Sequence, residues 1–125
     1  MLNILETVIQ VLRGAIPNSY YQNNPSKPVK YPYLTFTYTT DTLENGRGVF
    51  IDFNLFADRG HNSERIEEQA GKLIDLVDGG NAVFYENDVT LKLDTITINE
   101  FPTASEKLQR RTGQIYARTY DRREK

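Results

Sequence analysis

The sequence contains few residues that could carry out catalysis. His61 is the only histidine among 125 residues, Asp58 precedes it by three positions, and there is no cysteine. A metal site or a general base would need further ligands, or a nucleophile, within reach of this histidine. We therefore interpret His61 as a solvated residue in the loop that enters a helix. We expect that the protein is not an enzyme and that it binds no metal or cofactor.

Two further groups of residues have types that could form a chemical site. Residues 46–48, Gly-Arg-Gly, lack the Gly-Lys-Ser/Thr ending of a phosphate-binding loop and do not open a helix, so the glycines are better explained by backbone geometry. Asp52 and Asn54 share one face of a predicted strand, with Asp94 expected near them. Paired carboxylates can exchange protons, but the outward polar face of a strand looks the same, and we favour that interpretation.

Charge is distributed unevenly along the chain, although the net charge is only −2. Residues 41–106 hold 14 acidic and 5 basic side chains, whereas residues 107–125 hold 7 basic and 2 acidic ones. One interpretation is a solvated acidic body with a basic tail. The other is two surfaces of opposite charge that meet on neighbouring subunits, because complementary potentials fix the register of an interface.

The basic end also raises the possibility of nucleic-acid binding. Arg110-Arg111 and Arg122-Arg123 lie near Tyr116 and Tyr120 in the sequence, and such residues can bind phosphates and stack on bases. The chain as a whole is acidic, however, and contains no nucleic-acid-binding motif. A nucleic-acid-binding accessory protein therefore remains an alternative to ion pairing or a solvated tail.

Two amphipathic helices are predicted from apolar residues at helical spacing. The first helix precedes Pro17, and its apolar stripe consists of Leu5, Val8, Ile9, Leu12 and Ile16. The second follows a possible cap at Asn62 or Ser63, and its apolar stripe consists of Ile66, Ala70, Leu73, Ile74 and Val77. We expect both helices to pack on a sheet. No run of ~18 apolar residues occurs, and the first helix lacks a basic n-region, so we expect neither a transmembrane helix nor a signal peptide.

Strands are predicted where apolar and polar residues alternate. The predicted strands are Tyr33–Thr39, Val49–Phe56, a short one at Val83–Tyr85, one around Leu91–Ile98 and a last one at Gln109–Tyr120. Within Leu91–Ile98 the alternation slips by one residue, which predicts a bulge near Asp94–Thr95. Residues 17–30 are expected to form a loop, or a short edge strand around Tyr20 and Tyr21 followed by a loop. Thr40–Gly48 is expected to be a flexible hairpin loop.

These elements predict one α+β domain spanning residues 1–125. The expected fold is a single antiparallel β-sheet packed with two α-helices in the order α-β-β-α-β-β. We expect the basic C-terminal end, residues 121–125, to be disordered.

The order of the segments resembles a known family. A short helix and a proline-rich loop lead through Tyr31-Pro32-Tyr33 into a strand, and the next strand ends in Asn-Leu-Phe-Ala-Asp-Arg-Gly at residues 54–60. A glutamate-rich helix follows, and the closing strand ends in arginine and tyrosine. This pattern is similar to the small tail completion, or tail terminator, proteins of long-tailed bacteriophages and prophages.

The resemblance implies a structural protein without catalytic residues. Such proteins form a ring, typically a hexamer, that caps the head-proximal end of the tail tube, stops tube polymerisation and provides the surface that joins the head. The implied partners are further copies of the chain, the tail tube protein and a head-completion or connector protein. DNA would only pass through the channel, and no membrane is involved. The implied location is the host cytoplasm during assembly and then the virion tail. Another head–tail connector component, such as a head-closure or adaptor protein, is the nearest alternative.

Candidate contact residues follow from this hypothesis. The chain has eight tyrosines and no tryptophan, and tyrosine is enriched at protein interfaces. In the hairpin loop we expect tail-tube contacts from Leu43, Glu44, Asn45 and Arg47. In the basic last strand we expect contacts between subunits from Arg110, Arg111, Tyr116, Arg118 and Tyr120.

Overall fold

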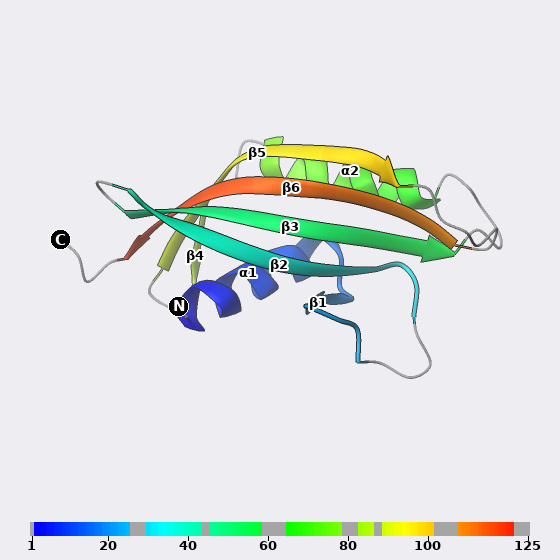
Figure 1. Ribbon diagram of the computed structural model, residues 1–125, viewed down its shortest axis with the longest axis horizontal. Helices are drawn as coiled ribbons and strands as arrows, with labels where there is room; N and C mark the ends of the chain where they lie inside the picture. Colours follow the sequence, from blue (N-terminus) through cyan, green and yellow to red (C-terminus); the bar gives the residue numbers. More distant parts are fainter. Residues whose placement is uncertain are drawn as a thin grey trace.

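The computed structural model describes residues 2–25, 30–43, 46–58, 65–78, 83–86, 89–101 and 108–121. These residues form mostly strands, together with two helices that pack on one sheet (Figure 1). In chain order the elements are α1 (Leu2–Ala15), β1 (Ser19–Tyr21), β2 (Tyr33–Leu43), β3 (Gly46–Asp58), α2 (Arg65–Asp78), β4 (Val83–Glu86), β5 (Val89–Phe101) and β6 (Leu108–Asp121).

The six strands form one mixed sheet in the order β1-β2-β3-β6-β5-β4, which curls into a half-barrel. The pairs β2–β3, β3–β6, β5–β6 and β4–β5 are antiparallel, but β1 runs parallel to β2. The prediction of a purely antiparallel sheet is therefore wrong, and so is the predicted element order α-β-β-α-β-β. The observed order is α-β-β-β-α-β-β-β.

The expected order did not include β1, and contacts at the end of α1 explain why this strand forms. The buried Ser19 hydroxyl donates a hydrogen bond to the Ile16 carbonyl (2.7 Å), and Arg13 Nε donates one to the Ser19 carbonyl (3.0 Å). These bonds hold β1 beside the helix end. The long connection from Tyr21 to Tyr33 then allows the chain to enter β2 in the same direction, which a tight turn could not do. Of the two interpretations of residues 17–30, the edge strand is the one observed.

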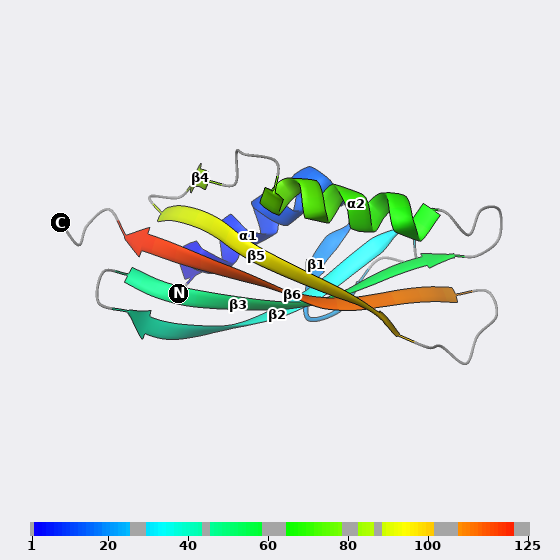
Figure 2. The same ribbon diagram turned by 90° about the horizontal axis from the view of Figure 1, so that it is seen from above.

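Both helices cover the same face of the sheet (Figure 2). Between helices and sheet lies the core, which includes Val8, Leu12, Leu34, Phe36, Ile51, Phe53, Leu55, Ile66, Leu73 and Ile115. Helix α2 meets it through Ile66, Ala70, Leu73 and Val77, as predicted. Ile74 is the exception, because it is 41% exposed. It follows Leu73 directly, so the helical rotation turns it away from the sheet.

Strand pairing also corrects the expected loop at Thr40–Gly48. Strands β2 and β3 stay paired from Thr40↔Val49 to Leu43↔Gly46. Only residues 44–45 connect them, and these lie outside the described residues. Asp41 and Arg47 are exposed on this extended hairpin. The polar residues of the segment therefore indicate solvent-exposed strands, and the predicted loop was a misinterpretation of that polarity. Gly46 has a φ of 139°, a backbone conformation that glycine tolerates.

The predicted bulge is confirmed. The register between β5 and β6 shifts between Leu93 and Thr95, which leaves Asp94 as the extra residue. Because of this shift, Leu93 and Ile96 both face the helices although they are three positions apart. Strands β4 and β6 lie within one residue of their predicted bounds. Asp121 is the last residue of β6, and residues 122–125 lie outside the described part of the chain.

Candidate assembly surface

Neither described helix covers the other face of the sheet, which we call the open face (Figure 2), and the side chains on that face are mostly polar or aromatic. Its residues alternate with the buried ones along each strand. They include Tyr33, Thr37 and Thr39 of β2, Phe50, Asp52, Asn54 and Phe56 of β3, Thr95 and Thr97 of β5, and Arg110, Thr112, Gln114, Tyr116 and Arg118 of β6. The open face as described by these residues therefore carries three of the nine predicted contact residues, Arg110, Tyr116 and Arg118.

One end of the open face is organised by stacked rings. Tyr33 stacks on Phe56 with 4.7 Å between ring centroids, and Tyr31 lies 5.5 Å from Tyr33. The Arg110 guanidinium lies 5.4 Å from the centroid of Phe56 and donates through Nη2 to Asn54 Oδ1 (2.7 Å). Burial and the neighbouring Tyr31 raise the pKa of Tyr33, which Arg110 opposes, so the Tyr33 hydroxyl remains protonated at neutral pH. These rings and Arg110 are thus held together by contacts within one chain.

The other end is organised by Tyr116. Its ring lies 4.9 Å from that of Phe50 and covers Gly48, where a Cβ atom would come within 3.2 Å of the Tyr116 hydroxyl oxygen. Tyr116 is therefore partly buried. Tyr120 is 37% exposed and lies beside Gly46, at the end of the β2–β3 hairpin. Of these two predicted contact residues, Tyr120 offers the larger free surface.

The predicted contact arginines have partners within the chain. Arg111 lies on the helix side of β6, where its Nη2 donates to Glu67 of α2 and is 3.6 Å from Glu100 Oε1. Arg118 Nε donates to Oδ2 of Asp94, the bulge residue, at 2.8 Å. This hydrogen bond raises the pKa of Arg118 further. Charge reversal at Arg110 and Arg111 would consequently disturb each subunit as well as any contact between subunits.

The sheet separates the predicted contact residues into two groups. Register places Arg47 opposite Thr119, so Arg47, Arg118 and Tyr120 lie at the hairpin end of the sheet. Arg110 and Arg111 lie at the opposite end, across from Phe56 and Leu55. At the hairpin end, Leu43 is the last residue of β2, and Glu44 and Asn45 lie outside the described residues.

The acidic strand residues considered for catalysis each have a separate partner. Asp52 accepts a hydrogen bond from Gln114 Nε2 (2.9 Å) and Asp94 pairs with Arg118, so each acidic side chain has its own partner. Asp58 ends β3, and His61 lies outside the described residues. Among the residues that the structure describes, no group of three or more His, Cys, Asp or Glu is placed to hold a metal ion. No described helix has the length and apolar character needed to cross a membrane.

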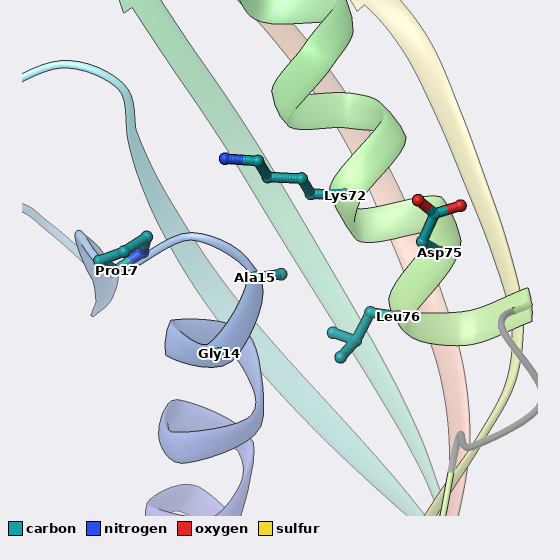
Figure 3. A pocket seen from close by; sticks show the side chains of 6 residues that line it. All are labelled: Gly14, Ala15, Pro17, Lys72, Asp75 and Leu76. Atoms are coloured by element: carbon teal, nitrogen blue, oxygen red, sulfur yellow. The ribbon is translucent and has the colours of Figure 1, made fainter.

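The helix layer contains a shallow groove between the end of α1 and the last turns of α2 (Figure 3). Its volume is about 470 Å³, and its lining residues are Gly14, Ala15, Pro17, Lys72, Asp75 and Leu76. Leu76 also lines a neighbouring hollow of about 290 Å³ with Gln10, Val11, Gly14 and Phe84. Lys72 and Asp75 are the ionisable residues lining the groove, so it lacks the convergent polar groups typical of a ligand site.

Comparison with known proteins identifies the fold. No protein-family model matches the chain, and no curated protein aligns with it significantly. Among solved structures, a chain from the virion of a native gene transfer agent particle superposes with a TM-score of 0.60 at 14% identity, over 94% of this chain and 95% of that one. Another structure, whose name states no function, gives a TM-score of 0.64 at 15% identity, over 94% and 91%. Both likenesses establish a shared fold over nearly the whole of each chain.

Proposed function

We propose that this chain is a structural virion protein and, more specifically, a tail terminator. In this role it forms a ring, with a hexamer as the expected size, on the head-proximal end of the tail tube. The ring stops tube polymerisation and presents the surface that joins the head. The observation that carries the proposal is the fold shared with a chain of a gene transfer agent virion over 94% and 95% of the two chains.

The surfaces of the subunit support an assembly role. The β2–β3 hairpin extends to the end of the sheet, with Arg47 and Tyr120 exposed there, and we assign this end to contacts with the tail tube. The sheet also has strand edges that a neighbouring copy could pair. Tyrosine-rich surfaces favour protein partners because the side chain offers large contact area with little loss of entropy.

The distribution of arginine contacts argues against nucleic-acid binding as the main function. Arg110, Arg111 and Arg118 each contact an acidic or polar side chain of the same subunit. A protein that binds the phosphate backbone would instead direct several such side chains into one basic stripe. The same pairing suits a ring through which DNA passes without being held.

Inactivation of the gene in a phage or inducible prophage that encodes the chain tests this function. We expect filled heads without tails, together with tail tubes of excessive and variable length, and we expect a plasmid copy to restore normal particles. Electron microscopy of the lysate provides both readouts. Tails of normal length beside unjoined heads would instead assign the chain to the head–tail connector. Complete, infectious particles would overturn the assignment to either role.

A further inference from the structure

Among the described strands, none pairs with the outer edge of the sheet along the β2–β3 hairpin. Strand β1 pairs only with Leu34–Phe36 of β2, and Gln22, with a φ of 69°, then turns the chain away. From there to Leu43, no described strand pairs with the outer side of β2. A free strand edge exposes backbone donors and acceptors to which another chain can bind.

Hydrogen bonds with β1 show which backbone groups face this edge. The Leu34 N–H donates to the Asn18 carbonyl (2.9 Å), and the Gln22 N–H donates to the Phe36 carbonyl (2.8 Å). Backbone groups alternate in direction along a strand, so those of even-numbered residues in β2 point outward. Thr40 and Thr42 therefore direct their N–H and C=O groups away from the sheet, in position to form a ladder with an added strand.

The opposite edge of the sheet ends in β4, which pairs only with β5 among the described strands. Val83 and Tyr85 of this strand are 59% and 47% exposed. Farther along the same side, β5 carries the bulge at Asp94 and the exposed Glu100, two features that hinder strand addition. In β4 the exposed residues Val83 and Tyr85 are a β-branched and an aromatic residue, both of which favour strands.

The two free edges lie at the ends of one row of paired residues. Register gives this row as Asp41↔Gly48↔Arg118↔Lys92↔Val83. The row has the exposed Asp41 at the β2 edge and carries Lys92 and Arg118 toward the β4 edge, where both basic side chains also contact Asp94 of the same subunit. A second copy placed beside the first would bring its Asp41 toward Val83 and the half-exposed Lys92 of the neighbour, which is an acidic–basic match between like subunits.

We propose that the β2 edge from Thr39 to Leu43 of one subunit pairs with β4 of the next, so that the sheets of neighbouring subunits join into one. Different surfaces meet in this contact, so it is head-to-tail and can close into a ring. Four antiparallel steps separate β2 from β4, so the two strands run in the same direction. Rotation about an axis along the strands keeps that direction, and the pairing is therefore parallel. This inference rests on the ring of the proposed function.

The absence of cysteine from the sequence allows a clean cross-linking test. Asp41→Cys and Val83→Cys each introduce a single thiol at an exposed end of the row. We expect a bifunctional maleimide to join the two single variants when they are mixed at high concentration, and to join neither variant to itself. The double variant should give a ladder of species that ends at the size of the closed ring. Asp52→Cys, on the exposed face of the central strand β3, is the matched control and should not cross-link with Val83→Cys.

Mass photometry of the same samples without cross-linker measures whether rings form. It therefore distinguishes a wrong edge contact from a wrong proposal of the ring. Rings that form without Asp41–Val83 cross-links would overturn the edge contact and leave the ring in place. Cross-linking of Asp41→Cys to itself would indicate a symmetric β2–β2 dimer and would also overturn it. Subunits that stay monomeric both at high concentration and on tail tubes would overturn the contact and the ring together.

Discussion

At the scale of residues, Gly113 shows how closely the sheet and its core are fitted. It lies in β6 between Phe53 of β3 and Ile98 of β5, on the side that faces the helices. A Cβ atom there would come within 2.6 Å of Phe53 Cζ and would also collide with the Thr97 carbonyl. The Phe53 ring, which is 1% exposed, thus occupies the space above the glycine. A side chain at this position must displace either the ring or the backbone of β5.

We therefore expect Gly113→Ala to lower the free energy of unfolding by about 1–3 kcal/mol, the usual cost of overpacking a core. Gly71→Ala is the matched control, because nothing lies within 4 Å of a Cβ at that helical position. It should stabilise the protein by up to about 1 kcal/mol through helix propensity. Urea unfolding of both variants measures the difference. Equal midpoints would show that Phe53 and β5 adjust without cost.

The arginines show the limit of prediction at the residue scale. Their types and positions were evident from the sequence, and so was the uneven charge along it. Their partners were not, because Glu67 lies 44 positions from Arg111, and Asp94 lies 24 from Arg118. These pairs depend on which strands and helices lie side by side. Side-chain partners of this kind follow from topology, which local patterns do not contain.

At the scale of elements, local patterns predicted most strands and both helices. Alternation located β6 and the bulge at Asp94, because a slip in a period of two is visible in the sequence itself. It failed for the end of the β2–β3 hairpin, where both faces are exposed and apolar residues are few. It also left β1 undecided, because three residues are too few for a pattern and Ser19 is held there by contacts with α1.

Helix α2 offers a direct test of its orientation. Leu73 is fully buried against the sheet and its neighbour Ile74 is 41% exposed. We expect Leu73→Ala to cost about 2–5 kcal/mol of stability, because it removes buried apolar surface and leaves a cavity. Ile74→Ala should cost of the order of 0.5 kcal/mol, as is usual near the surface. Thermal or urea denaturation compares the two, and similar losses would mean that the helix is rotated from its described position.

At the scale of the whole molecule, the sheet brings distant parts of the chain together. Strand β6 inserts between β3 and β5, so the last strand of the sequence lies near the middle of the sheet (Figure 1). The described sheet ends on one side in β1 and the part of β2 beyond it, and on the other side in β4, and both helices cover one face (Figure 2). It also places Asp41 and Val83 at the two ends of one row. A shape with one covered face and two free edges is suited to closing a ring with identical neighbours.

The central claim is that the protein ends tail tubes as a ring. The most direct measurement is electron microscopy of tubes polymerised from the tail tube protein of the same phage or prophage, with and without this protein. We expect ring-shaped density at one end of each tube and a halt to further elongation when more tube protein is supplied. Bare tube ends and unchanged elongation, with the folded protein present in excess, would contradict the account.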